Sequence, residues 1–166
     1  MSAQDSKLFV ISGPSGAGKG TLVTRVRERR SNLGLTVSAT TRAPRKGEVD
    51  GVNYFFLTRE EFDRRVANGE FVEWAEVHGN CYGTLVSEVT SKLASGASLI
   101  LEIDVQGALQ VKERFPEAVL IFIKPPSLEV LRERLVGRGT ETPETIELRM
   151  ANAADELALA LSLIHI

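Results

Sequence analysis

Residues 8–21 read LFVISGPSGAGKGT. The apolar residues 8–11 predict a buried parallel strand, and the amphipathic residues 21–30 predict a helix. Between them, residues 13–19 match the pattern G-x-x-x-x-G-K in the strand-to-helix context that this pattern requires. Its glycines let the backbone fold around phosphate oxygens with the N–H groups turned inward, and its lysine adds a positive charge. The stretch therefore predicts a P-loop that holds the phosphates of a nucleoside triphosphate.

The predicted ATP-binding residues are the loop and the two residues after it: Gly13, Pro14, Ser15, Gly16, Ala17, Gly18, Lys19, Gly20 and Thr21. The residue after the motif lysine is usually a serine or threonine that binds Mg²⁺, but Gly20 has no hydroxyl group. Mg²⁺ bound with ATP is therefore expected either to use Thr21, directly or through water, or to be held mostly by phosphates and water. The sequence leaves both arrangements open.

Composition and charge limit the class of protein. At 166 residues the chain is long enough to bury the core of one domain. A net charge of −2 argues against a general nucleic-acid or membrane-surface binder, because such proteins rely on a basic excess. No stretch approaches the roughly 18 apolar residues of a membrane span, and the first residues show no signal-peptide pattern. Cys81 is the single cysteine, which excludes an intrachain disulfide and favours a reducing compartment. A cytoplasmic protein is expected.

Beyond the loop, apolar strands alternate with helices. Further core strands are expected at residues 99–103 and 119–123. The expected helices occupy residues 85–94, 107–114, 128–136 and 142–160. This alternation predicts an α/β fold, with a parallel sheet core and helices on both faces.

The stretch of residues 35–84 interrupts the alternation and is interpreted as an inserted lobe. It combines short, mixed elements, with strands expected at residues 35–41, 54–57 and 71–77, a helix at 60–67 and a turn at 78–83.

A phosphate-binding pattern of another kind lies in this lobe. Residues 38–54 read SATTRAPRKGEVDGVNY and place Arg42 and Arg45 three residues apart around a proline. Two guanidinium groups on a stiff loop suit a phosphate dianion, although two solvated arginines would give the same bare pattern. Together with FVEWA at residues 71–75, GNCYG at 79–83 and LEIDVQG at 101–107, this segment resembles the guanylate kinase family. The likeness extends over about residues 7–160.

The resemblance implies a P-loop nucleoside monophosphate kinase with a GMP-binding lobe and a lid. The implied reaction transfers the γ-phosphate of ATP to GMP, giving ADP and GDP, and belongs to purine nucleotide metabolism. By the same resemblance, the GMP phosphate would be held by Arg42, Arg45, Tyr54 and Tyr82. The guanine base would be read by Ser38, Glu73, Thr84 and Asp104.

The chemistry of guanine agrees with this assignment of Glu73. Guanine presents two adjacent donors, N1–H and the N2 amino group, and one carboxylate can accept both. A hydroxyl group from Ser38 or Thr84 can donate to guanine O6. Adenine would leave a buried carboxylate unpaired, and polar complementarity of this kind can discriminate by roughly 10⁴ or more.

The segment LRERLVGRG at residues 131–139 places Arg134 and Arg138 four residues apart on one helix face, and Arg149 lies on the following helix. The bare pattern also fits a solvated basic face, whereas the resemblance implies a lid over the triphosphate. Phosphoryl transfer needs charge neutralisation and exclusion of water more than it needs a base. No general base is therefore assigned, and the predicted catalytic residues are Lys19, Arg45, Arg134, Arg138 and Arg149.

The expected core comprises residues 1–34 and 85–160, with the lid at about 127–149, and the expected GMP-binding lobe comprises residues 35–84. The last six residues, LSLIHI, are interpreted as an artefactual tail because they look like a translated sequencing adapter. Family members continue with a further strand, a turn that borders the adenine site and a closing helix. The chain is therefore expected to be truncated at its C-terminus.

Two alternative functions remain open. A non-catalytic module with a guanylate kinase fold could bind phosphorylated proteins, but such modules lack a working phosphate loop and lid. Another nucleoside monophosphate kinase would share Gly18–Thr21 but would not need the pair of Glu73 and Asp104. The expected partners are small molecules, ATP and GMP, with no nucleic acid and no membrane.

Overall fold

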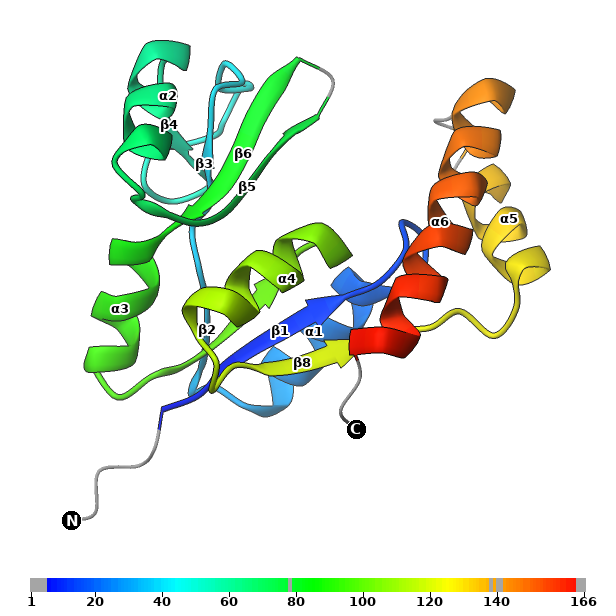
Figure 1. The fold of residues 1–166 in the computed structure, drawn as a ribbon, viewed down its shortest axis with the longest axis horizontal. Helices are drawn as coiled ribbons and strands as arrows, with labels where there is room; N and C mark the ends of the chain where they lie inside the picture. The colour runs from blue at the N-terminus through cyan, green and yellow to red at the C-terminus, as the bar shows by residue number, and fades with distance from the viewer. Residues whose placement is uncertain (1–5, 78, 138, 140–141, 164–166) are drawn as a thin grey trace.

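The computed structural model describes residues 6–77, 79–137, 139 and 142–163 (Figure 1). The strands are β1 Leu8–Ser12, β2 Leu33–Leu35, β3 Ala39–Thr40, β4 Phe55–Phe56, β5 Phe71–Val77, β6 Asn80–Leu85, β7 Ser98–Glu102 and β8 Val119–Phe122. The helices are α1 Lys19–Arg29, α2 Arg59–Ala67, α3 Val86–Ala94, α4 Val105–Arg114, α5 Leu128–Gly137 and α6 Pro143–Leu163.

The core is a parallel sheet with the strand order β2-β7-β1-β8. Side chains of a strand alternate between the two faces, and the sequence of β1 fills both faces with apolar residues. Leu8 and Val10 pack with residues of α3 and α4, whereas Phe9 and Ile11 pack with residues of α1. Figure 1 shows α4 and α1 on opposite sides of the sheet. The predicted α/β fold, with a parallel core and helices on both faces, is confirmed.

A second, mixed sheet has the order β4-β3-β6-β5, and its inner face packs against α2. The rings of Phe62 on α2 and Phe71 on β5 stack with centroids 4.3 Å apart. Two predictions fail here. Residues 80–83 were expected in a turn, but they belong to β6, which pairs antiparallel with β5. The single strand expected at residues 35–41 is divided: β2 joins the core sheet through β7, and β3 joins the second sheet through β6.

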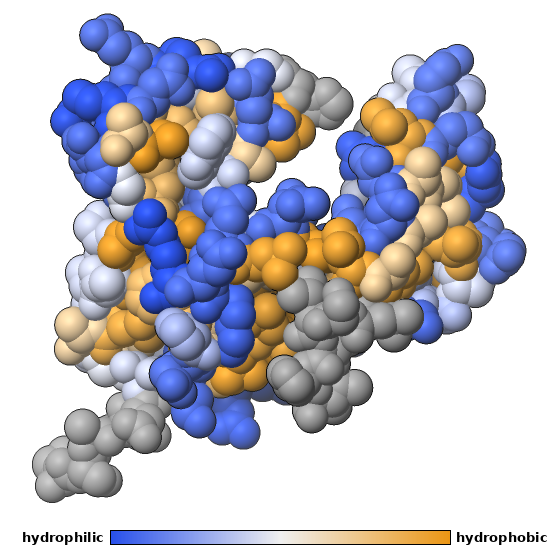
Figure 2. Space-filling model, in the orientation of Figure 1, coloured by the Kyte–Doolittle hydropathy of each residue, from blue (hydrophilic) through white to orange (hydrophobic). Residues whose placement is uncertain are grey.

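The helices α5 and α6 form an antiparallel pair around Leu131, Leu135, Ile146 and Ala153. Ser127 begins α5 as predicted, because its Oγ accepts a hydrogen bond from the backbone N–H of Val130 at 3.2 Å. The pair rises on one side of the molecule and the second sheet on the other (Figure 1). Figure 2 shows a hollow between these two parts, with α4 beneath it. None of the helices in the described ranges is both long and apolar enough to cross a membrane.

Candidate active site

The loop after β1 has two positions, 13 and 18, whose backbone conformation favours glycine. Gly13 has φ +140°, and a Cβ there would lie 2.4 Å from the carbonyl oxygen of Ile123 after β8. Gly18 has φ 101° and occupies the N-cap position of α1. Both conformations disfavour a residue with a side chain. The loop therefore passes close to the end of β8 and delivers the positive end of α1 to its interior, as an anion-binding loop requires.

Cations from three helices surround this loop. The Lys19 ammonium donates to the carbonyl oxygens of Gly13 at 2.5 Å and Pro14 at 3.1 Å. Arg134 of α5 donates to the carbonyl oxygen of Ala17 at 3.2 Å. Arg149 of α6 contacts the Ser15 hydroxyl oxygen through a short hydrogen bond. The structure thus brings together Lys19, Arg134 and Arg149, whereas Arg138 lies outside the described residues.

The beginning of α1 also offers oxygen ligands. A Cβ on Gly20 would lie 3.6 and 3.8 Å from the two carboxylate oxygens of Glu102, at the end of β7. Thr21 is exposed on the first turn of α1. Mg²⁺ prefers oxygen ligands and keeps several of its waters, so this hydroxyl and carboxylate fit a hydrated Mg²⁺ beside bound phosphates. Glu102 was not among the predicted site residues, because its place near α1 depends on the pairing of β7 with β1.

Across the hollow, an arginine and two tyrosines of the second sheet and its loops lie close together. Arg42 forms an ion pair with Glu48, in which one terminal guanidinium nitrogen lies 2.9 and 3.0 Å from the two carboxylate oxygens. Its guanidinium carbon lies 5.3 Å from the ring centroid of Tyr54, and the Tyr54 and Tyr82 centroids are 6.3 Å apart. Arg45 is exposed, and its backbone N–H donates to Glu48 at 2.7 Å. Arg42, Tyr54 and Tyr82 thus lie together, with Glu48 as an anionic partner that the sequence analysis did not assign.

Three of the four predicted base-reading residues, Glu73, Thr84 and Asp104, lie where β5, β6 and the start of α4 meet. Glu73 is buried, and its Oε1 accepts a hydrogen bond from the buried Thr84 hydroxyl at 2.7 Å. A Cβ on Gly107 would lie 3.2 Å from Glu73 Oε2 and 3.4 Å from Asp104 Oδ1. Asp104 is the N-cap of α4 and accepts the Gly107 N–H at 2.8 Å. Ser38 lies immediately before β3, where its carbonyl oxygen accepts the Phe55 N–H.

The environment of Glu73 is unusual for a carboxylate. Burial raises the pKa of Glu73, the hydrogen bond from Thr84 opposes this rise, and the negative charge of Asp104 adds to it. A glycine at position 107 leaves room beside the carboxylate, because any side chain there would contact both Glu73 and Asp104. A buried acceptor of this kind suits a ligand that brings its own donors.

Comparison with known proteins identifies the family to which this arrangement belongs. The sequence model described as guanylate kinase matches residues 5–164. The chain belongs to the guanylate kinase family. The guanylate kinase of Halalkalibacterium halodurans is 55% identical over 159 residues, which cover 96% of this chain and 78% of that protein. The guanylate kinase of Gloeobacter violaceus is 58% identical over 155 residues, covering 93% and 76%.

A solved structure of the same family has the same fold. The crystal structure of guanylate kinase from Anaplasma phagocytophilum superposes with a TM-score of 0.70 at 38% sequence identity, and it covers 96% of this chain and 74% of that one. The resemblance inferred from the sequence motifs is therefore confirmed at the level of family, fold and enzyme class.

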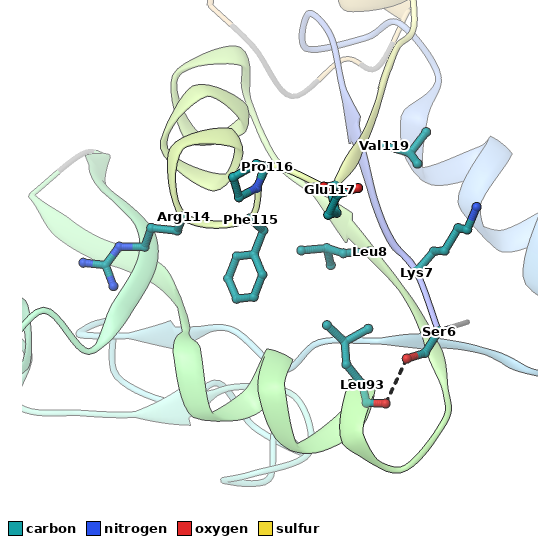
Figure 3. A pocket seen from close by; sticks show the side chains of 10 residues that line it. Ser6, Lys7, Leu8, Leu93, Arg114, Phe115, Pro116, Glu117 and Val119 are labelled. Atoms are coloured by element: carbon teal, nitrogen blue, oxygen red, sulfur yellow. Dashed lines mark hydrogen bonds between the residues drawn. The ribbon is translucent and has the colours of Figure 1, made fainter. Parts of the chain in front are cut away.

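A further pocket of this guanylate kinase family member lies at the opposite end of the core sheet. It has a volume of about 510 Å³, and Figure 3 shows Leu8, Leu93 and Phe115 lining it, with the Ser6 hydroxyl bonded to the Leu93 carbonyl oxygen. Ser6 and Leu8 lie at or before the amino end of β1, Leu93 lies in the last turn of α3, and Phe115 directly follows α4. Ligands of parallel α/β sheets bind at the carboxyl ends, where the P-loop and Asp104 lie. The pocket is therefore separate from the candidate active site.

Proposed function

We propose that this guanylate kinase family member transfers the γ-phosphate of ATP to GMP in the hollow between the second sheet and the helices α5 and α6, giving ADP and GDP. The observation that carries the proposal is the buried Glu73 carboxylate, bonded to Thr84 and close to Asp104. It lies across the hollow from a P-loop that is surrounded by Lys19, Arg134 and Arg149.

The P-loop and its cations would hold ATP. Inward backbone N–H groups of residues 13–19 and the N-terminus of α1 favour phosphate oxygens, and the Lys19 ammonium would turn from the loop carbonyls to the β- and γ-phosphates. Mg²⁺ bound with the nucleotide would supply positive charge that neutralises part of the phosphate charge. Glu102 and Thr21 would hold its water shell, and Gly20 leaves room for that shell.

The second sheet would hold GMP. One terminal nitrogen of Arg42 now contacts both carboxylate oxygens of Glu48, and a phosphate dianion would offer this guanidinium group oxygen acceptors of higher charge. Tyr54 and Tyr82 lie beside that fork, and Arg45 follows on the same loop. Glu73 would accept the two adjacent donors of guanine, with Asp104 near the amino group. The Ser38 hydroxyl would donate to O6, and the Thr84 hydroxyl, which now donates to Glu73, would have to turn from that carboxylate to do the same.

The acceptor needs no general base, because the second pKa of a phosphate monoester is about 6 and its oxygens are ionised at neutral pH. The chain would contribute positioning and positive charge. Arg45, Arg134, Arg138 and Arg149 would stabilise the transferring phosphoryl group together with Lys19. We infer that residues 35–84 act as the GMP-binding lobe and that about residues 127–149 act as a lid. Small, cytoplasmic metabolites would be the only partners that this reaction requires.

Turnover with a panel of acceptors tests the proposal. ADP formation from Mg·ATP would be measured with GMP, AMP, CMP and UMP at equal concentrations. We expect GMP to exceed the other acceptors in kcat/KM by about 10³ or more, because buried polar groups reject a base that leaves them unpaired. Comparable turnover of AMP would overturn the assignment of the base-reading group, and no turnover with any acceptor would favour a non-catalytic binding module.

A further inference from the structure

The outer edge of the second sheet carries Glu73 and is bonded to a side chain of the core. β5 lies at the end of the strand order β4-β3-β6-β5. Both backbone polar groups of one residue in an antiparallel strand point to the same side, and those of Trp74 meet the Gln110 amide of α4. The Trp74 N–H donates to Gln110 Oε1 at 3.2 Å, and Gln110 Nε2 donates to the Trp74 carbonyl oxygen at 3.3 Å. Gln110 thus takes the place that the backbone of a further strand would occupy, at the residue next to Glu73.

An irregularity of the ladder lies beside this contact. Phe71 of β5 lies opposite Leu85 of β6. Glu73, two residues later, lies opposite Thr84, which is only one residue away from Leu85, so the register shifts as in a β-bulge. Val72 is the extra residue and packs in the core, whereas Glu73 bonds to the Thr84 hydroxyl. A bulge disrupts the ladder and re-aims a side chain, so the direction of Glu73 depends on the contacts that hold β5 close to this point.

One face of α4 supplies these contacts. Gly107, Gln110 and Arg114 are spaced by three and four residues, which places them on the same side of the helix. A Cβ at Gly107 would lie 3.2 Å from Glu73 Oε2 and 3.4 Å from Asp104 Oδ1. Arg114 donates to a backbone carbonyl oxygen two residues before β5, at 2.7 Å. This face of α4 therefore runs along β5, and the same helix holds Asp104 at its N-cap.

We propose that Gln110 is a positioning residue for base selectivity: its amide holds the peptide next to Glu73 and so keeps this carboxylate aimed at both donors of guanine. The inference rests on the proposed function, in which Glu73 reads the base. Hydrogen bonds weaken steeply when their angle falls below about 120°, so a carboxylate that turns away keeps one donor and loses the other. Inosine monophosphate (IMP) has the N1–H donor and O6 of GMP but lacks the amino group. Gln110 therefore contributes to the preference for GMP over IMP.

The substitution Gln110→Met tests this proposal, because methionine keeps the length and helix propensity of the side chain and removes both bonds to Trp74. Calorimetric titration would give the affinity for GMP, and displacement of GMP by IMP would give the affinity for IMP. We expect GMP to bind about fivefold more weakly and IMP to change by less than about twofold, with kcat at saturating GMP within about twofold of the parent value. Glu113→Met replaces an exposed side chain one turn further along α4, and this control should change neither affinity by more than about twofold.

A double-mutant cycle shows whether Gln110 acts through Glu73. In the Glu73→Gln background, Gln110→Met should weaken GMP binding by less than about twofold, because the carboxylate that it positions is absent. A full effect in that background would overturn the proposal, as would equal losses of GMP and IMP affinity in the single variant. Equal affinities of the parent protein for GMP and IMP would instead overturn the base-reading assignment on which this inference rests.

Thermal melting separates positioning from general stability. Gln110→Met should melt within about 5 °C of the parent protein, because it loses two partly exposed hydrogen bonds and keeps its volume. The ratio of the GMP and IMP affinities does not depend on the fraction of protein that is folded. A variant with a much lower melting temperature and an unchanged ratio, or a variant that does not fold, would show that the amide only stabilises the structure, and the proposal would be wrong.

Discussion

At the scale of single residues, the proposed acceptor selectivity depends on Glu73, which is buried and already accepts one hydrogen bond from Thr84. In Glu73→Gln the amide group would turn a donor toward a donor of guanine. We expect kcat/KM for GMP to fall by about 10² or more, since a buried polar group loses its partner. Steady-state kinetics would measure the change. Glu76→Gln on the same strand is the control, because Glu76 is exposed, and a decrease below about threefold in Glu73→Gln would exclude Glu73 as the base reader.

The raised pKa of Glu73 gives a pH dependence with a definite sign. Burial favours the protonated form in the folded protein, so ionisation occurs at a higher pH than the usual value of about 4.3. Guanine donors need the ionised form as acceptor, and guanosine affinity should therefore decrease as the pH falls through this raised pKa. Guanosine is a better probe than GMP, because the phosphate of GMP itself titrates near pH 6 and would add its own pH dependence. A flat calorimetric profile between about pH 4.5 and pH 7 would contradict this prediction.

The guanidinium group of Arg42 gives a third prediction at the scale of single residues. Both terminal contacts to Glu48 go through one guanidinium nitrogen, and the Tyr54 ring packs beside the group. Arg42→Lys keeps the charge but loses the planar fork and the stacking. We expect KM for GMP to rise about tenfold with little change in KM for ATP. Arg59→Lys, on the exposed start of α2, should leave both constants unchanged, and an equal effect of the two substitutions would argue against a phosphate site at Arg42.

At the scale of elements, the P-loop depends on close passage between its backbone and the end of β8. Gly13→Ala would place a Cβ against the Ile123 carbonyl oxygen and keep a positive φ. Gly96→Ala, after α3, has a positive φ of 83° but no neighbour within 4 Å. We expect Gly96→Ala to cost about 1 kcal/mol and Gly13→Ala about 3 kcal/mol in the free energy of unfolding. Denaturant titration would measure both, and equal losses would show that the close approach does not matter.

The elements that repeat a clear periodicity were predictable from the sequence. The apolar runs at β1, β7 and β8 and the helices between them were found close to their observed bounds, because burial on both faces of a parallel sheet leaves a strong apolar signal. β6 was missed, since Tyr82 and Gly83 follow Gly79 in a segment rich in turn-forming residues. Its conformation is decided by pairing with β5, which a local pattern does not contain.

The contrast between local sequence patterns and tertiary contacts also separates the site residues that were predicted from those that were missed. Lys19, Arg42 and Glu73 lie within short motifs, where neighbouring residues mark them. Glu102 acquires its place only through tertiary structure, because β7 lies beside β1 in the core sheet.

At the scale of the whole molecule, nucleotide binding is expected to be divided between two parts of one chain. The helices α5 and α6, whose Arg134 and Arg149 contact the P-loop, rise on one side of the hollow, and the second sheet lies on the other (Figures 1 and 2). Binding of one nucleotide should therefore tolerate damage to the site of the other, whereas phosphoryl transfer needs both sites intact.

The variant Lys19→Ala gives the most direct test of two separate nucleotide sites. Its affinity for GMP would be measured by calorimetric titration, and its rate of GDP formation by a kinetic assay. We expect the rate of transfer to fall by at least about 10², because the β- and γ-phosphates lose the positive charge of the Lys19 ammonium. We expect the affinity for GMP to stay within about threefold of the parent value, which is a difference below about 0.7 kcal/mol. A loss of GMP affinity as large as the loss of transfer would contradict two separate sites.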